Sequence, residues 1–248
     1  MGTFKGDLYR EEHTFHSILC AIYVEQYYIH SFEELERLVT MADYYCTLRI
    51  VSLTLNGPLL HRSMPSEDLR DNACRATELA VKLRHKYLFE DCLTLSAGPW
   101  NAPSYESDGF KDDEARLYLL ALHTRGSIAN MIDAVQQQLL LAATYEKEAA
   151  PTEIQNAKGF GEELMNIAQQ ARLCGTTGLL QLPLYYRLLS KSDIIMTRLS
   201  ESWQLSCLLG NDRELIPGAK SGKGIFGDHF LCRTYDHDYP WDSNETDW

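Results

Sequence analysis

The spacing of apolar residues is the feature that most constrains how this chain folds. Through most of the sequence, apolar side chains recur three and four positions apart, which gathers them on one face of an α-helix. The first two stripes of this kind are Phe15, Ile18, Leu19, Ile22 and Tyr23, and then Phe32, Leu35, Leu38, Val39, Ala42 and Tyr45. The pattern predicts a mainly α protein that is built as a helical bundle.

The helix that carries the second stripe has a clear start signal. Ser31 is followed three residues later by Glu34, the spacing of a capping box, in which each side chain accepts a hydrogen bond from a free backbone N–H group of the first turn. Gly57-Pro58 is expected to fray the end of the next helix. Further helices are predicted near residues 48–59, 69–83, 88–95, 114–147, 152–171 and 192–209.

Several segments lack helical spacing. Residues 24–30, VEQYYIH, are aromatic and β-branched and predict a brief edge strand. Residues 98–113 combine Gly, Pro, Ser and acidic residues, which is typical of a linker. Residues 217–224 predict a flexible turn, and residues 225–236 predict a short β element near the C-terminus, before an acidic and aromatic tail.

Composition narrows the classes of partner. Hydrophobic residues make up 45% of the chain, enough for a buried core, and the formal net charge of the 248 residues is −12. Because Lys and Arg drive binding to phosphate backbones, this charge opposes nucleic-acid recognition. The longest purely aliphatic run, residues 139–143, is far too short to span a bilayer. We therefore expect neither a nucleic acid nor a membrane as partner.

The cysteines indicate a reducing compartment. The sequence has seven of them, an odd number, and no two form a CxxC pair. Residues 1–12 contain no apolar segment of the kind found in secretory signals. Thiols that stay reduced are typical of intracellular proteins, so the expected location is the cytoplasm or the nucleus.

Residues 218–224, GAKSGKG, approach a phosphate-binding loop without matching it. The loop requires G-x-x-x-x-G-K followed by Ser or Thr, so that the glycine-rich backbone holds phosphate and the hydroxyl group holds magnesium. The interval from Gly218 to Gly222 is one residue short, and Lys223 is followed by Gly224. We therefore predict no nucleotide and no other cofactor.

His13, His16 and Cys20 form an incomplete set of metal ligands. Their spacing of i, i+3 and i+7 places them near one face of the first helix, and zinc accepts all three side chains but requires about four ligands. The sequence also has no G-x-S-x-G nucleophile elbow. We predict no metal site, no catalytic residue and a non-enzymatic protein; a helical metal protein or enzyme that uses these three residues is the alternative.

Residues 13–57 resemble the C-terminal half of a BTB/POZ domain, in which one helix leads through a short edge strand into two more helices. Residues 72–100 and 229–242 are similar to the helical region and the tail of fungal BTB proteins. The resemblance to the domain is carried by Phe15, Leu19, Ile22, Tyr23, Leu35, Leu38, Ala42, Asp43 and Tyr45.

The resemblance divides the chain into three parts. Residues 1–61 are expected to form a partial BTB/POZ helix set, 62–215 a helical extension with its linker near 98–113, and 216–248 the turn, the short strand and the tail. The strands and helices that begin a BTB domain have no counterpart before residue 13. We therefore expect the apolar faces of the first two helices to pack on downstream helices or on another chain.

The function that the resemblance implies is protein–protein interaction. BTB proteins often act as adaptors of cullin-based ubiquitin ligases or as self-associating scaffolds, so the expected partner is another protein, such as a cullin, or a second copy. Tyr27 and Tyr28 are adjacent candidates for contact with a partner, because tyrosine is favoured at interfaces. An equal alternative is that one of them packs in the core and the other is an ordinary surface residue. A truncated fragment without function is the third alternative. The candidate contact residues are Tyr23, Tyr27, Tyr28, Phe32 and Trp241.

Overall fold

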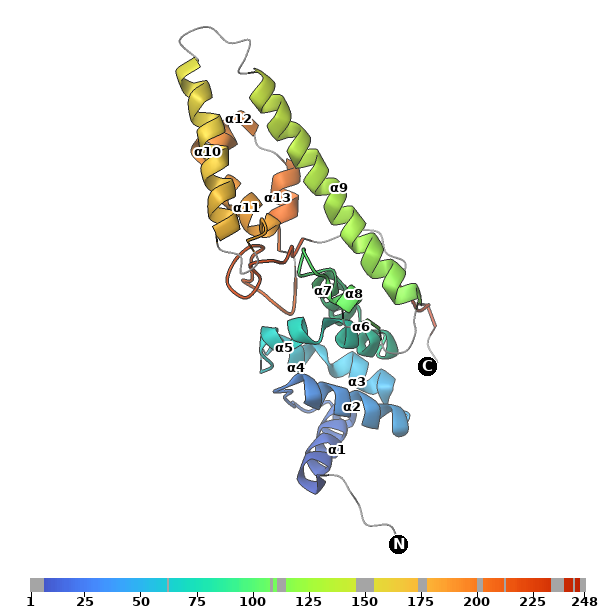
Figure 1. The fold of residues 1–248 in the computed structure, drawn as a ribbon. Coiled ribbons are helices and arrows are strands. Elements are labelled where there is room, and N and C mark those ends of the chain that lie inside the picture. The colour runs from blue at the N-terminus through green and yellow to red at the C-terminus, as the bar shows by residue number, and fades with distance from the viewer. Residues whose placement is uncertain are drawn as a thin grey trace.

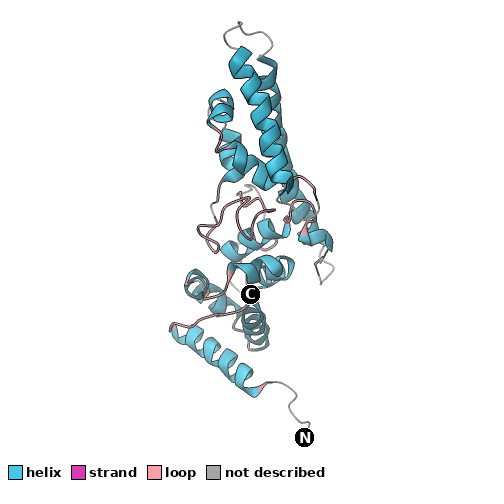
Figure 2. Ribbon diagram, turned by 60° about the vertical axis from the view of Figure 1, so that its left-hand side comes forward, coloured by secondary structure: helices cyan, strands magenta, loops and turns pink. Residues whose placement is uncertain are grey.

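The computed structural model confirms a mainly α fold, with thirteen helices in the part of the chain that it describes. The described residues are 7–61, 63–107, 109–110, 115–145, 154–173, 178–199, 203–211, 213–232, 239–242 and 244–245. The molecule is elongated, and its two ends are helical with a loop-rich segment between them (Figures 1 and 2).

The N-terminal end of the molecule consists of four helices. The Ser31 half of the predicted capping box forms, since Ser31 Oγ accepts from Glu34 N at 3.3 Å. The other half differs: Glu34 Oε2 accepts from His30 N, which precedes the N-cap residue, at 2.7 Å. The predicted fraying at Gly57-Pro58 is wrong, because both residues lie in the first turn of a helix, where proline needs no backbone donor. The helices are α1 (Leu8–Tyr23), α2 (Phe32–Tyr44), α3 (Leu48–Thr54) and α4 (Asn56–Leu60).

The edge strand predicted for residues 24–30 is absent from the structure, which describes this segment in full. The residues alternate as a strand would: Tyr27 and Ile29 are buried, whereas Tyr28 and His30 face outward. No neighbouring strand offers backbone groups for pairing among the described residues, so the segment remains an extended connection.

The middle of the chain forms α5 (Ser66–Asp71), α6 (Ala73–Lys82), α7 (Lys86–Ser96) and the short α8 (Ser104–Ser107). The single helix predicted over 69–83 is divided at Asn72, whose side-chain Nδ2 donates to the Asp68 carbonyl at 2.8 Å. That bond satisfies a terminal carbonyl of α5 and allows the chain to turn. α8 lies inside the predicted linker, and Tyr105 within it is buried.

The other end of the molecule is formed by a long helix and four that pack along it (Figure 1). These are α9 (Ala115–Tyr145), α10 (Ile154–Leu173), α11 (Leu182–Leu189), α12 (Asp193–Leu199) and α13 (Trp203–Leu209). α11 was not predicted from the sequence. Residues 192–209, predicted as one helical segment, form the two helices α12 and α13 in the structure.

Two buried clusters make up the interior. The first joins α1 to α7 with the start of α9, and the second joins the remainder of α9 with α10 to α13. Their boundary falls within α9, between Ala121 and Ile128. Residues on both sides of position 61 contribute to the first cluster, for example Leu59 and Leu69.

Residues 213–232 run between the two clusters and contribute to both. Leu215 and Leu231 belong to the first cluster, and Phe230 and Cys232 to the second. The short β element predicted here is reduced, among the described residues, to one isolated antiparallel bridge. Turns occupy the rest, so side-chain contacts, not a sheet ladder, hold this segment in place.

The glycine-rich turn at 217–224 has a packing role. Gly222 has a φ of 72°, in the left-handed region, and a Cβ placed there would lie 2.5 Å from the carbonyl oxygen of Pro183 at the start of α11. Only glycine combines this backbone conformation with so close an approach. The turn thereby fits against the second helical end, which accounts for its composition without a phosphate ligand.

Candidate interaction surface on the first helix

α1 packs on the body of the protein through four small side chains and one isoleucine. Its buried residues are Thr14, Ser17, Ile18, Cys20 and Ala21. The two hydroxyl groups donate to carbonyls one turn earlier, Thr14 Oγ1 to Arg10 O at 2.9 Å and Ser17 Oγ to His13 O at 3.1 Å. Both polar groups are therefore satisfied, and the small face allows close approach to the neighbouring helices.

The large apolar side chains of α1 lie on its outer face. Leu8, Phe15, Leu19 and Ile22, which we call the α1 stripe, are 71%, 41%, 37% and 40% exposed. At 100° per residue they fall within an arc of roughly 60° on the helix. α1 forms one end of the molecule, beside α2 and α3, so its outer face meets solvent (Figure 1). Contiguous exposed apolar surface of this kind marks interaction sites.

An aromatic group borders the α1 stripe at the end of α2. The ring of Phe15 lies 5.6 Å from the ring of Tyr45, which lies 5.0 Å from the ring of Tyr44. Both tyrosines are exposed. They also line a groove of about 530 Å³, together with Glu11, Glu36, Arg37, Thr40 and Met41. The surface thus combines apolar area, aromatic rings and a shallow depression.

The same surface is acidic. Glu11 and Glu12 lie in the N-terminal half of α1, and neither carboxylate has an ion-pair partner among the described residues. Arg10 is already engaged, with Asp7 at 3.2 Å and with Glu33 at 2.8 Å. Residues 7–45 contain eight acidic and two basic side chains, a formal net charge of −6, half of the charge of the whole chain.

The predicted contact residues differ in exposure. Tyr23, at the end of α1, is 74% exposed, and Tyr28 is also at the surface. Tyr27 and Phe32 are buried in the first cluster, and burial raises the pKa of Tyr27, whose hydroxyl lies 3.1 Å from Thr54 Oγ1. In this conformation both side chains pack in the core and are not accessible to a partner. Trp241 is half-buried, with its ring 5.2 Å from that of Phe89.

Sequence reasoning missed one member of the surface. Leu8 lies seven residues before Phe15 and completes the α1 stripe. The i, i+7 spacing was the available signal. The apolar face of α2 differs from that of α1, because Phe32, Leu35, Leu38, Val39 and Ala42 are all buried. Of the two faces that required a covering partner, the structure covers only the second.

The structure does not assemble a full metal site from His13, His16 and Cys20. Cys20 Sγ lies 3.6 Å from His16 Nδ1, but Cys20 is buried on the inner face of α1, whereas His13 is exposed. In the described part of the chain, no three His, Cys, Asp or Glu side chains gather as a metal site would require.

No helix in the described ranges is long and apolar enough to cross a membrane. Comparison of the chain with protein-family models, with curated proteins and with solved structures found no match.

Proposed function

We propose that this chain is a non-enzymatic protein–protein interaction module that binds its partner through the α1 stripe. The observation that carries the proposal is the orientation of α1: Leu8, Phe15, Leu19 and Ile22 face solvent, whereas Ile18 and the small residues face the core. Transfer of such side chains from water into an interface is favourable by about 25 cal/mol for each Å² of apolar area.

The finer proposal is an adaptor or scaffold of BTB type, linked to a cullin-based ubiquitin ligase. It rests on the resemblance of residues 13–57 to the C-terminal half of a BTB/POZ domain. Two helices of that segment are present as α1 and α2, and residues 24–30 between them are extended but do not form the expected edge strand. Tyr23 and Tyr28 lie within this block and are accessible, which supports their role as contact residues.

Isothermal titration calorimetry of the purified chain with a purified cullin N-terminal domain tests the finer proposal. The double variant L19S/I22S removes the C-terminal half of the α1 stripe and should abolish the heat of binding. The matched control L140S/M165S changes two side chains that are 66% and 73% exposed on α9 and α10 and should bind as the native chain does. Absence of binding by the native chain would rule out the cullin as a direct partner. The wider proposal of an interaction module would then be decided by the peptide selection described below.

A further inference from the structure

The surface of α1 restricts what kind of partner it accepts, through its length and its charge. The α1 stripe extends from Leu8 to Ile22, which is about 21 Å along the helix at 1.5 Å per residue. A partner helix of roughly fourteen to sixteen residues covers that length. An amphipathic helix that lies along another helix presents apolar side chains at the same three- and four-residue spacing.

The two free carboxylates determine the sign of the partner's charge. Glu11 and Glu12 border the α1 stripe on opposite sides, each roughly 20° outside its arc at 100° per residue. Glu11 also lines the groove shared with α2. A helix docked on the stripe therefore covers or borders both groups. A carboxylate that loses water without a cationic partner costs free energy, so a complementary helix must supply Lys or Arg near them.

A second copy of the chain is a poor occupant for the same reason. In an antiparallel pair centred on Phe15, Glu11 of one copy faces the uncharged half of the other α1 helix, near Leu19. In a parallel pair, the Glu12 side chains of the two copies face one another. Each arrangement also brings together two surfaces of net charge −6. Like charges across an interface disfavour association.

We propose that the α1 stripe binds a basic amphipathic helix of a partner protein, whose apolar side chains cover Leu8, Phe15, Leu19 and Ile22 and whose Lys or Arg residues pair with Glu11 and Glu12. This inference rests on the proposed function and specifies its partner. Tyr44 and Tyr45, next to Phe15, add aromatic faces that accept the aliphatic and cationic parts of such side chains.

A peptide selection tests the charge without assuming a partner. The probe is a library of sixteen-residue helical peptides with leucine at the a and d positions and Lys, Glu or Gln at random in the flanking positions, a length of about 24 Å. The library is selected on the immobilised full chain and, in parallel, on the L19S/I22S variant. Because the two chains carry the same charge, unspecific attraction of lysine to an acidic protein cancels between them.

The expected result is a set of peptides that need the native stripe and carry Lys at the flanks nearest Glu11 and Glu12. For the best of these, fluorescence anisotropy should show a dissociation constant that rises at least about tenfold in L19S/I22S and several-fold in E11Q/E12Q, with a weaker salt dependence in the latter variant. Circular dichroism melts of both variants verify that they remain folded.

The opposing outcomes separate the two proposals. Stripe-dependent peptides without a preference for Lys, or stripe-dependent dimerisation of the chain in analytical ultracentrifugation, would overturn the basic partner and leave the interaction module intact. If no peptide depends on the stripe and the chain is monomeric, both the basic partner and the module are wrong.

Discussion

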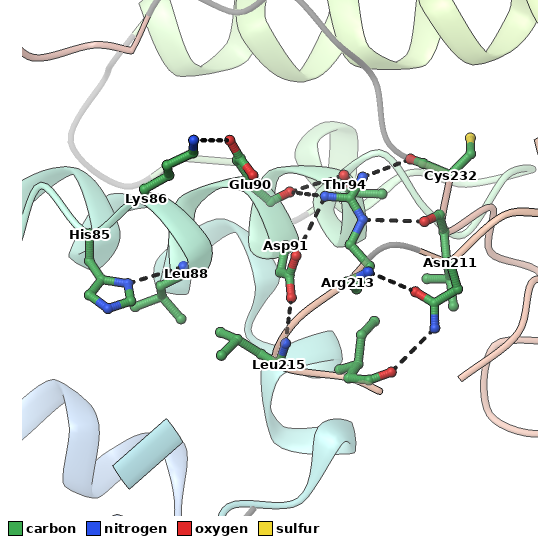
Figure 3. A network of polar contacts seen from close by, with 12 residues as sticks. His85, Lys86, Leu88, Glu90, Asp91, Thr94, Asn211, Arg213, Leu215 and Cys232 are labelled. Carbon is green, nitrogen blue, oxygen red and sulfur yellow. Dashed lines mark hydrogen bonds and ion pairs between the residues drawn. The ribbon is translucent and has the colours of Figure 1, made fainter. Parts of the chain in front are cut away.

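Arg213 and Asp91 form a buried ion pair between the C-terminal segment and α7, with Arg213 Nη1 3.5 Å from Asp91 Oδ1 (Figure 3). The guanidinium also donates to the carbonyls of Glu90, Leu231 and Cys232, at 2.9, 3.2 and 2.7 Å. Asp91 Oδ2 accepts from Leu215 N at 2.8 Å. Because residues 213–232 contribute to both buried clusters, this pair sits where the two helical ends of the molecule meet.

Replacement of Arg213 by methionine should therefore destabilise the protein by roughly 3–5 kcal/mol, since it leaves the Asp91 carboxylate buried without its counter-charge. Urea unfolding followed by circular dichroism measures the change. The matched control is K82M, which breaks the surface pair between Lys82 Nζ and Asp43 Oδ2 and should cost less than about 1 kcal/mol. Equal losses in the two variants would show that Arg213 has no special role at the junction.

His85 should make stability fall in acid. Its Nδ1 accepts from Leu88 N at 3.2 Å as the N-cap of α7, and burial lowers its pKa from 6.5 to about 4. Since the folded-state pKa is depressed, the contribution of His85 is complete above about pH 6.5 and is lost as the pH falls through about 4.

Asp91 acts in the opposite direction, because burial raises its pKa from 3.8 to about 6, and the stability linked to its protonated form is lost as the pH rises through that value. The difference between the native chain and H85N isolates His85, as asparagine also caps helices and does not titrate. We expect H85N to lose less stability than the native chain between pH 6.5 and about 4, measured by urea unfolding. If the unfolding free energies of the native chain and H85N change with pH in the same way, the neutral imidazole of His85 does not cap α7.

Two isoleucines on α1 test which face of the helix is buried. Ile18 is 2% exposed and Ile22 is 40% exposed, one turn apart. I18A should cost about 2–4 kcal/mol through lost burial and a residual cavity, whereas I22A should cost less than about 1 kcal/mol. Thermal and urea unfolding measure both. If I22A proves the more costly change, α1 is rotated relative to the structure and the α1 stripe is buried.

Alanine substitution at two glycines distinguishes the effect of close packing on stability from the effect of helix propensity. A Cβ at Gly98 would lie 2.3 Å from Cδ2 of the buried His229 ring, whereas a Cβ at Gly126 in α9 meets no atom within 4 Å. We expect G98A to destabilise the protein by roughly 1–3 kcal/mol and G126A to stabilise it by about 1 kcal/mol. Differential scanning calorimetry distinguishes the signs, and a neutral G98A would mean that His229 moves aside freely.

Local pattern was sufficient to predict most of the helices. The N-cap of α2 at Ser31 and the buried face of α2 both follow from spacing within a few residues, because a helix is built from contacts between residues one turn apart. The edge strand at 24–30 was wrong because a strand needs a partner that is distant in sequence. Its alternation of buried and exposed residues is present without the ladder.

Composition and periodicity establish that this protein is helical, acidic and apolar enough for a core, because both are properties of the chain alone. Tertiary structure decided which side of α1 is covered. The inward face of the helix is made of small residues and Ile18, and only its neighbours reveal that Ala21 faces inward and Leu19 outward. It likewise brought Arg213 to Asp91 across more than a hundred residues, a pairing that no local spacing encodes.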